Sequence, residues 1–492
     1  MKTEKHRTST KYKTLTKHKR GTRRKRLVRK NSAFRYDTDT FGTVAIPKDR
    51  YWGPDTQRSI IYFSIGQEKM PIEFIHTYAL FKKCAAITNY KLGLIDKKKA
   101  DIIVKVCNEI IDNKYNNEFP CHIWQTGSGT QTNMNVNEVI ANICNQILTG
   151  KLGTKTPINP NDDVNMSQSS NDSFISVMHI YIAITIVHKL IPSLTFMING
   201  FKKKQYEFND IIKIGRTHLE DAVPLTFGQE FSGYVATFEE SLSQIKSVLK
   251  NIYQLAAGGT AVGTGINTVH SFGKDVAKEI AKETGLHFVT ADNKYAVMSN
   301  HNAVLEMSDA LKLLATNIMK IANDLRWLGS GPRAGIHELT LPQNEAGSSI
   351  MPGKVNPTQC EAAAMVAVQV IANNMAITIA NSQGYFELNV YNPLMLYNIA
   401  QSIRNLTDVC NNFTKFCVLG IQVNKDKVQY YLDNALTLAT GLNKHIGYDK
   451  STIIARYAYK KNISLKEANK ILKFVPEDKI DEYLNPKNMI HN

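Results

Sequence analysis

One pattern decides the fold: residues Ala303 to Leu328 read AVLEMSDALKLLATNIMKIANDLRWL. The apolar residues recur at the three- and four-residue spacing that places them on one face of a helix. Asp309, Lys312, Lys320 and Asp324 interrupt the apolar run, and no uninterrupted run of about 18 apolar residues, the length of a membrane span, occurs in the chain. The pattern therefore predicts a long helix that is buried in a protein core and does not cross a membrane.

Four further segments repeat this pattern at similar length. They are Asp172–Asn199, Gln229–Ala257, Gln359–Ala380 and Leu388–Val418. Helices of roughly 25 to 30 residues greatly exceed the average of about 11 to 12 residues. Such helices need apolar partners along most of their surface, and a bundle formed by several subunits provides more of them than a bundle formed by one. Strand-like alternation is scarce, so we expect a mostly α protein with an elongated helical core in a homo-oligomer.

Shorter patterns flank the long ones. Apolar residues at helical spacing predict helices in Phe74–Leu92, Asp101–Ile111 and Val136–Leu148. The body of the chain opens near Phe34 with Gly- and Pro-containing sequence that we expect to form a loop. After the bundle, we expect a helix over Lys427–Leu442 and smaller helices up to the C-terminus.

The positive charge of the chain lies in its N-terminal tail. Residues 1–30 hold fourteen Lys and Arg and one acidic residue, Glu4, so they carry +13 of the net charge of +17. The body is nearly neutral, and we expect neither nucleic acid nor membrane as its partner. For the tail, three interpretations stay open: a solvated segment, a mitochondrial transit peptide, and salt-sensitive adhesion to nucleic acid or membrane.

The seven cysteines are scattered and lie mostly within apolar helical patterns. They are Cys84, Cys107, Cys121, Cys144, Cys360, Cys410 and Cys417. We expect buried, reduced thiols in a reducing compartment. The sequence has no Cys-x-x-Cys pair or Cys-rich cluster that would hold zinc or an iron–sulfur centre, so we predict no metal.

Five polar segments rich in Gly, Ser, Thr and Asn lie beside the helices. They are TGSGTQTNMNVNE at 126–138, NMSQSSND at 165–172, GRTHLEDA at 215–222, GGTAVGTG at 258–265 and GSSIMPGKVNP at 347–357. Hydroxyls, amides and helix N-termini are donors that suit carboxylate oxygens. One such segment alone is more often a helix cap than a site. Five together favour a site for a dicarboxylate, with Lys354 as its cation.

Other interpretations of these residues are weaker. The glycines at 126–138 and 258–265 match neither Gly-x-Gly-x-x-Gly after a strand nor a loop that ends in Gly-Lys-Ser/Thr, so a nucleotide site is rejected. His218 considered alone is more often a structural histidine than a catalyst. Asp162 and Asp163 considered alone form a solvated pair, because no calcium-loop spacing surrounds them.

The five segments, in this order, closely resemble those of class II fumarases, within the fumarase/aspartase superfamily of lyases. The resemblance extends from about Phe34 to the C-terminus, includes NKHIGYDK at 443–450, and leaves out only the basic tail. It implies a three-domain fold with a central long-helix bundle, assembled as a homotetramer in which three subunits contribute to each active site. We expect a disordered basic extension at 1–33, an N-terminal domain at 34–168, a central bundle domain at 169–425 and a small helical domain at 426–492.

Two segments discriminate within the superfamily. In Gly215–His218, His stands where aspartases have Gln. The segment PGKVNPTQCE at 352–361 follows the fumarase form, whereas argininosuccinate lyases have Gln-Lys in its middle. The resemblance thus implies that hydroxide, not an amine, is the leaving group. It implies the reversible hydration of fumarate to (S)-malate, a tricarboxylic acid cycle reaction, without any metal or organic cofactor.

Removal of a C–H proton beside a carboxylate requires that the developing charge be held, here as a dianionic aci-carboxylate. The family gives Ser348, on a mobile loop, the role of the base, with Lys354 and backbone donors to help it ionise. His218, oriented by Glu361, would assist the departure of hydroxide on the opposite face. The resemblance assigns substrate binding to Ser128, Gly129, Thr130, Ser169, Ser170, Asn171, Thr217, Ser349, Lys354, Val355 and Asn356.

The family also has a second, peripheral dicarboxylate site around an Asn-Asp-Asp segment, usually entered by an Arg and a His. Asn161 and Asp162 are retained here, but Thr156 and Asn159 stand at the two cationic positions. Lys155 compensates only in part. We therefore expect Asn159, Asn161 and Asp162 to bind a second dicarboxylate weakly or not at all, with near-normal catalysis.

Two alternative functions stay open. The first is an aspartate ammonia-lyase of the same superfamily. The second is a non-catalytic scaffold, although such a protein should have lost some of the catalytic groups, and all of them are present. Reduced thiols and the lack of an amphipathic presequence favour a cytoplasmic location, with the mitochondrial matrix as the alternative.

Overall fold

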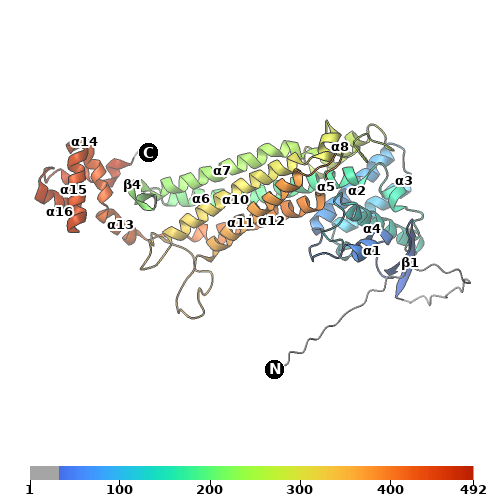
Figure 1. Cartoon of the computed structure of the whole chain (residues 1–492), viewed down its shortest axis with the longest axis horizontal. Helices are drawn as coiled ribbons and strands as arrows, with labels where there is room; N and C mark the ends of the chain where they lie inside the picture. The colour runs from blue at the N-terminus through green and yellow to red at the C-terminus, as the bar shows by residue number, and fades with distance from the viewer. Residues whose placement is uncertain (1–32, 491–492) are drawn as a thin grey trace, which may run out of the picture.

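The computed structural model describes residues 33–490, so the expected disordered extension at 1–33 lies almost entirely outside the described residues. Long helices form an elongated bundle in the middle of the molecule (Figure 1). They are α5 (Ser170–Thr185), α6 (Ile191–Glu207), α7 (Phe227–Ile252), α10 (Asn302–Leu328), α11 (Thr358–Asn381) and α12 (Asn392–Phe416). The π turn η3 (Ile186–Leu190) joins α5 to α6 in one continuous rod. The prediction of a mostly α chain built around long helices is confirmed.

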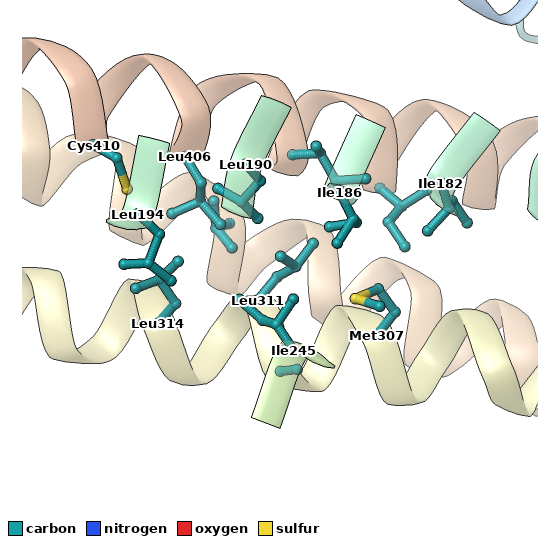
Figure 2. Close-up of a cluster of buried hydrophobic side chains, with 14 of the residues drawn as sticks. Ile182, Ile186, Leu190, Leu194, Ile245, Met307, Leu311, Leu314, Leu406 and Cys410 are labelled. Carbon is teal, nitrogen blue, oxygen red and sulfur yellow. The ribbon is translucent and has the colours of Figure 1, made fainter. Parts of the chain in front are cut away.

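The core of the bundle is made by aliphatic side chains from four of these rods. Helix α10 packs against α7 and α11, while α12 packs against α6 and α11. Leu190, Ile245, Leu311 and Leu406 are fully buried together, one from each of four packed segments (Figure 2). The helical spacing of these residues in the sequence is thus explained by burial along the full length of each rod.

Two of the rods are long and apolar enough to cross a membrane by length and composition alone. Residues Ser170–Glu207 are mostly buried inside the molecule, as a core helix of the bundle should be. Helix α11 has a mean hydropathy of 1.6, yet only 33% of it is buried within the chain. The described chain therefore leaves much of an apolar helix uncovered.

The N-terminal domain packs at one end of the bundle. It consists of β1 (Phe34–Asp39), β2 (Gly42–Pro47), α1 (Pro54–Tyr62), α2 (Ile72–Lys91), α3 (Lys97–Ile111), η1 (Asn116–Glu118), α4 (Thr130–Thr149) and η2 (Pro160–Val164). The expected loop near Phe34 was wrong, because β1 and β2 form an antiparallel hairpin. Val44 and Ile46 alternate into the core, and Gly42 adopts a φ of 114° at the turn. The short alternation was obscured by the Gly and Pro residues around it.

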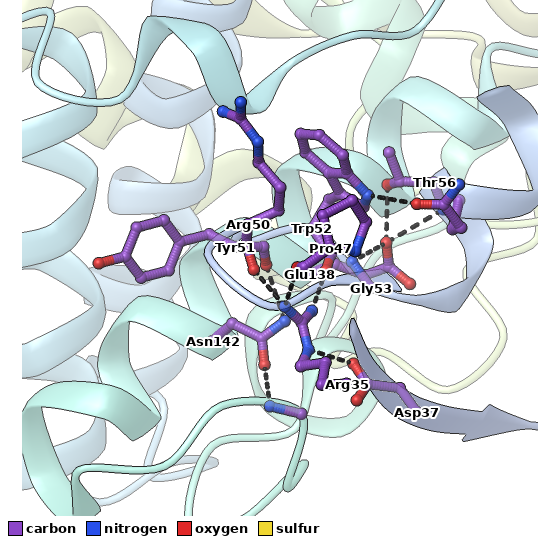
Figure 3. A network of polar contacts seen from close by, with 12 residues as sticks. Arg35, Asp37, Pro47, Arg50, Tyr51, Trp52, Gly53, Thr56, Glu138 and Asn142 are labelled. Atoms are coloured by element: carbon purple, nitrogen blue, oxygen red, sulfur yellow. Dashed lines mark hydrogen bonds and ion pairs between the residues drawn. The ribbon is translucent and has the colours of Figure 1, made fainter. Parts of the chain in front are cut away.

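A buried carboxylate holds the start of α1 in this domain. Glu138 on α4 accepts hydrogen bonds from the backbone N–H groups of Gly53, Asp55 and Thr56 and from the Thr56 hydroxyl, at 2.7 to 3.1 Å (Figure 3). Burial raises the pKa of Glu138 to about 7. The carboxylate takes the place of the N-cap that Gly53 lacks.

The opposite end of the bundle carries a hairpin and the small C-terminal domain. The elements there are β3 (Ile212–Thr217), β4 (Glu220–Thr226), β7 (Leu339–Thr340), η4 (Val418–Gly420), β8 (Gln422–Val423), α13 (Lys425–Asn434), η5 (Leu436–Leu442), α14 (Asn443–Ile446), α15 (Tyr448–Lys461), α16 (Leu465–Leu472), α17 (Ile480–Tyr483) and η6 (Pro486–Met489). The expected helix over Lys427–Leu442 was partly wrong. The α-helix ends at Asn434, and the chain turns at Ala435 so that Ala435, Leu438 and Leu442 are all buried.

Short elements complete the junction between the bundle and the N-terminal domain. They are β5 (Gln254–Leu255), α8 (Phe272–Thr284), β6 (Val289–Thr290) and α9 (Lys294–Ser299). The predicted helix over Gln229–Ala257 was too long at its C-terminal end. Helix α7 stops at Ile252, and the apolar residues that follow pair with β6 as a parallel strand.

All seven cysteines are reduced and buried, as predicted. The closest pair is Cys360 and Cys417, with 4.0 Å between the two sulfur atoms. Burial raises the pKa of most of these thiols, so they pack as small apolar groups at neutral pH.

Candidate active site

Three of the five polar segments meet at the N-terminal end of the bundle. The buried carboxylate of Asp172 joins two of them, because it accepts the backbone N–H groups of Ser169, Gly258 and Thr260, each at 2.9 Å. Burial raises the pKa of Asp172 to about 6, although these hydrogen bonds oppose the rise. The predicted donors Ser169, Ser170 and Asn171 therefore start α5 beside the 258–265 segment.

The first segment is held against the same helix. Gly129 has a φ of 76° at the N-cap of α4, and a Cβ at this position would lie 2.1 Å from the ring of Phe174 on α5. Ser128 and Thr130 lie on either side, with 2.9 Å between their hydroxyl oxygens. Glycine is thus required where the first segment meets the second, and the predicted hydroxyl donors of both lie near one another.

A lysine that the sequence did not indicate lies beneath these donors. Lys82 on α2 is buried, and its ammonium donates to the side-chain oxygens of Asn133 (2.8 Å), Asn165 (3.0 Å) and Gln168 (2.7 Å). The amide of Asn133 donates in turn to Ser170 Oγ at 3.0 Å. Burial lowers the pKa of Lys82 to about 7, while Asp172 acts in the opposite direction.

The 347–357 segment forms a closed loop at the other end of the bundle, between α10 and α11. The backbone N–H of Gly347 donates to the carbonyl of Lys354 at 3.0 Å, and the amide of Asn356 donates to the carbonyl of Gly347 at 2.5 Å. Ser348 Oγ accepts the backbone N–H groups of Ile350 (3.2 Å) and Met351 (2.9 Å). The predicted base therefore sits in a tight turn with two backbone donors aimed at its oxygen.

The predicted cation and its neighbours on this loop face solvent. Ser349, Lys354 and Val355 are exposed. The loop borders a cavity of about 210 Å³ whose lining includes Lys354, Val355, Asn356 and His337. Asn356, predicted to bind substrate, uses its amide to close the loop within the chain.

The β3–β4 hairpin presents His218 at its tip. Thr217 and His218 are exposed, and His218 adopts a φ of 59°, which is uncommon for a residue other than glycine. The guanidinium of Arg216 pairs with both oxygens of the fully buried Glu338, at 2.7 and 2.9 Å. Lys213 adds a contact of 3.1 Å to Glu338. This ion-pair network anchors the hairpin to the segment that leads into the Ser348 loop.

Glu361, the predicted partner of His218, lies in the first turn of α11. Its nearest ion-pair partner among residues 33–490 is Arg326, at 4.0 Å. No hydrogen bond joins Glu361 to His218 within the described chain. Their pairing remains a prediction.

The predicted site residues form two groups that one chain does not bring together. A Cβ at Gly259 would lie 2.7 Å from Met298 Sδ, so the 258–265 segment lies close to the start of α10, whereas the Ser348 loop follows the end of α10. A helix of 27 residues is about 40 Å long. The hydrogen-bond donors at 128–130 and 169–171, which are predicted to bind the substrate carboxylates, therefore lie at one end of the bundle. The proposed acid and base lie at the other end (Figure 1).

At the candidate second site, the polar groups of the turn η2 already bond to one another. Asn159 Oδ1 accepts the backbone N–H groups of Asn161 (2.8 Å) and Asp162 (3.3 Å), so it caps η2. The interpretation of Asp162 and Asp163 as a solvated pair was wrong for Asp163, which is buried and accepts a hydrogen bond from Lys99 at 2.8 Å. Asn161 and Asp162 are exposed without a neighbouring Arg or His side chain in the segment.

Among residues 33–490, no group of three or more His, Cys, Asp and Glu side chains is arranged to hold a metal ion. The residues missed by the sequence analysis are Lys82, Asn133 and Asp172. Asn133 and Asp172 stand inside the quoted polar segments. The position of Asp172 at the start of a predicted helix was a signal that its carboxylate could cap that helix. Lys82 gave no signal, because it is one of three lysines in α2 and nothing in the sequence distinguishes it from Lys83 and Lys91.

Known proteins share this sequence over most of its length. A family model described as "Lyase" matches residues 42–372, and one described as "Fumarase C C-terminus" matches residues 438–491. A class II fumarate hydratase of Helicobacter pylori is 51% identical over 93% of this chain and 99% of its own length. The human mitochondrial fumarate hydratase is 50% identical over 93% of this chain and 90% of its own length.

Solved structures show the same architecture. A class II fumarase from Schistosoma mansoni superimposes with a TM-score of 0.91 at 42% identity, covering 93% of this chain and 99% of that one. A Brucella melitensis fumarate lyase:delta crystallin reaches a TM-score of 0.89 at 36% identity, covering 93% and 100%. The fold is thus that of the lyase superfamily. Within it, the chain belongs to the class II fumarate hydratase family.

Proposed function

We propose that this chain is a fumarate hydratase, a hydro-lyase that interconverts fumarate and (S)-malate in the tricarboxylic acid cycle. Relatives with that name share half of its residues over nearly its whole length. The observation that carries the proposal is the Ser348 loop, where two backbone N–H groups donate to the Ser348 hydroxyl and Lys354 stands on the same loop beside a cavity. Such an arrangement suits a base that must carry negative charge.

The proposed mechanism uses the two groups on opposite faces of the substrate. Ser348 takes the C3 proton of malate, and the Ile350 and Met351 N–H groups stabilise the charge on its oxygen. Lys354 holds the aci-carboxylate that develops. His218 then donates a proton to the departing hydroxide, and Glu361 orients its ring.

The remaining predicted residues bind the substrate carboxylates. Ser128, Thr130, Ser170 and Asn171 offer hydroxyl and amide donors at the N-terminal starts of α4 and α5. The positive ends of the two helix dipoles add to the attraction for an anion. Ser169 and Gly129 contribute less directly, since Ser169 Oγ accepts from Asn171 N within its capping box and Gly129 lets the segment pack.

We infer a homotetramer with active sites shared between subunits. The two half-sites of one chain lie about 40 Å apart along α10, too far to act on one four-carbon substrate. A second chain running antiparallel would bring its Ser348 loop to the donor end of the first. The exposed apolar side chains of α11 support such packing: Met365 (68%), Val368 (58%), Met375 (59%) and Ile379 (57%).

We propose three domains with the boundaries 34–168, 169–425 and 426–492, after the extension at 1–33. The first boundary falls just before the N-cap of α5, and the second falls in the first turn of α13. We also propose a reducing compartment, the cytoplasm, with the mitochondrial matrix as the alternative. The buried thiols support a reducing compartment, and N-terminal sequencing of the mature protein distinguishes the two.

Parallel assays with malate and aspartate, followed by fumarate absorbance, test the proposed function. We expect turnover of malate and none of aspartate, because His218, at the tip of the β3–β4 hairpin, stands where aspartases have Gln. Turnover of aspartate alone would make the chain an ammonia-lyase. Turnover of neither would make it a non-catalytic scaffold.

A further inference from the structure

We propose that Lys82 is a positioning residue for dicarboxylate binding, which turns the hydroxyl proton of Ser170 toward the substrate. This inference rests on the proposed function and adds a residue outside the polar segments. Lys82 lies on α2, while its three partners come from α4 and from the segment before α5.

Three side-chain oxygens lie 2.7 to 3.0 Å from Lys82 Nζ, and this set of acceptors favours the ammonium form over the neutral amine. An ammonium group only donates, so the three contacts determine how three amide groups are oriented. Asn133, Asn165 and Gln168 must each turn the oxygen toward Lys82 and the nitrogen away from it. All three N–H donors of Lys82 are then used, which is the condition for burying a charged group at acceptable cost. At 1% exposure, Lys82 has no route to solvent.

The orientation of the Asn133 amide determines how the Ser170 hydroxyl is oriented. With its oxygen held by Lys82, Asn133 Nδ2 donates to Ser170 Oγ at 3.0 Å and to Asn165 Oδ1 at 3.1 Å. Ser170 Oγ therefore accepts a hydrogen bond from Asn133, which is buried inside the protein. Its own proton remains available for an acceptor on the other side, and a carboxylate oxygen is such an acceptor.

Loss of the ammonium would remove the constraint on the Asn133 amide, and with it the outward orientation of the Ser170 proton. Without Lys82, only Ser173 Oγ, 3.5 Å from the Asn133 oxygen, and Asn165, which has itself lost the ammonium, still orient the Asn133 amide. The amide can then turn its oxygen toward Ser170, so that the Ser170 proton points inward and a lone pair faces the substrate. A carboxylate would then meet a lone pair instead of a donor. The loss falls on ground-state and transition-state binding alike, so it raises KM and leaves kcat nearly unchanged.

Lys82→Met is the direct test, with Lys83→Met as its matched control. Lys83 is the next residue on α2, is half-buried, and pairs with Glu283 at 2.6 Å, so it makes none of the contacts of Lys82. We expect Lys82→Met to raise the KM for fumarate and the Kd for succinate, a non-reacting dicarboxylate, about tenfold or more, with kcat within about threefold. Lys83→Met should change none of these values.

A double-mutant cycle with Ser170→Ala separates this role from a general structural one. If Lys82 acts through Ser170, Lys82→Met should add less than about a twofold rise in Kd to the Ser170→Ala variant. An equal rise with and without Ser170 would overturn the proposal, as would a KM unchanged by Lys82→Met. A fall in kcat and melting temperature at constant KM would mean that Lys82 is only structural.

Asn133→Asp covers the case in which Lys82→Met does not fold. An aspartate still accepts from Lys82, but it also accepts from Ser170, so the Ser170 proton turns inward while the buried charge keeps a partner. We expect the same rise in KM and in the Kd for succinate. An Asn133→Asp variant with wild-type succinate affinity would refute the proposal.

The succinate measurement also keeps this inference apart from the proposed function. Wild-type protein that binds succinate without hydrating fumarate would overturn the proposed function, and the Lys82 comparison would still decide the inference. Wild-type protein that binds no dicarboxylate would overturn both.

Discussion

His218 illustrates how a single residue is presented for chemistry. It stands at the tip of the β3–β4 hairpin with a φ of 59°, exposed, and its strand is anchored through Arg216 and Glu338. A left-handed backbone conformation at a non-glycine residue costs roughly 1 kcal/mol or more. The ion pairs of the neighbouring Arg216 with Glu338 hold the strand in place and offset this cost.

The first prediction concerns the role of His218. We expect His218→Asn to lower kcat by about 10²- to 10⁴-fold, the usual contribution of a general acid, with little change in the KM. The melting temperature should stay the same, because the side chain is exposed. Steady-state kinetics with malate provide the measurement, and a His218→Asn variant with full turnover would refute the assigned role.

Two other histidines are buried and have depressed pKa values. Burial lowers the pKa of His179 to about 4 and that of His301 to about 3, with His179 adding to the shift of His301. His179 Nδ1 contacts the carbonyl of Gln254 at 2.9 Å, which suits a neutral ring with its proton on that nitrogen. Both rings are therefore uncharged in the folded protein at neutral pH.

The second prediction is the pH dependence of stability that follows. An unfolded histidine has a pKa of about 6.5, so below that pH the unfolded state binds more protons than the folded state. Stability contributed by the neutral rings is present above pH 6.5 and is lost as the pH falls toward about 4. Each ring should contribute about 1.4 kcal/mol per pH unit in this window.

Urea unfolding between pH 7 and pH 4.5 measures this effect. His301→Gln should flatten the dependence, whereas replacement of the exposed His270 by Gln should leave it as in the wild type. An unchanged slope in His301→Gln would contradict the prediction.

At the scale of elements, the turn η2 decides whether a second dicarboxylate binds. The side-chain oxygen of Asn159 accepts hydrogen bonds from the N–H groups of Asn161 and Asp162, and no cationic residue stands at 156 or 159. An N-cap alone, facing two exposed acidic or amide side chains, attracts a dianion weakly.

The third prediction is therefore the absence of dicarboxylate at this turn. Crystals soaked in malate or succinate should show no density there while the active sites fill, and full occupancy at the turn would contradict the prediction. Thr156→Arg supplies one missing cation on an exposed position and should strengthen binding at the turn without altering the KM.

The elements also show what the sequence allows one to predict. The long rods were predictable, because apolar residues such as Leu311 and Ile318 keep the helical period over seven or more turns. The β1–β2 hairpin was missed, since only Val44 and Ile46 alternate into the core. The end of α7 was misplaced because Leu255 is apolar in a strand as it would be in a helix.

The candidate site was predictable where its residues are close in sequence. Ser169, Ser170 and Asn171 stand at a helix start, and Ser348 and Lys354 share one loop. Lys82 was not predictable, because its partners are 51 to 86 residues away and only the tertiary fold brings them to it. Contacts of that range leave no pattern in a single sequence.

At the scale of the whole molecule, the fourth prediction concerns α11. A charge at Met375, which is 59% exposed on an apolar helix, should prevent the contact between subunits that we infer. We expect Met375→Glu to lower the mass measured by light scattering toward that of one chain and to abolish activity. Lys460→Glu, on the exposed surface of α15, is the control and should remain assembled and active. A Met375→Glu protein of unchanged mass would contradict the proposed interface.

The separation of the two half-sites along α10 has a genetic consequence. An allele that encodes His218→Asn and an allele that removes three carboxylate-binding hydroxyls, with Ser128→Ala, Thr130→Ala and Ser170→Ala together, damage opposite ends of the bundle. If each site draws these residues from different chains, co-expression mixes the two products at random, and about a quarter of the sites escape both lesions. A heterozygote of two null alleles would then regain hydratase activity, whereas two alleles that alter the same end would not complement each other.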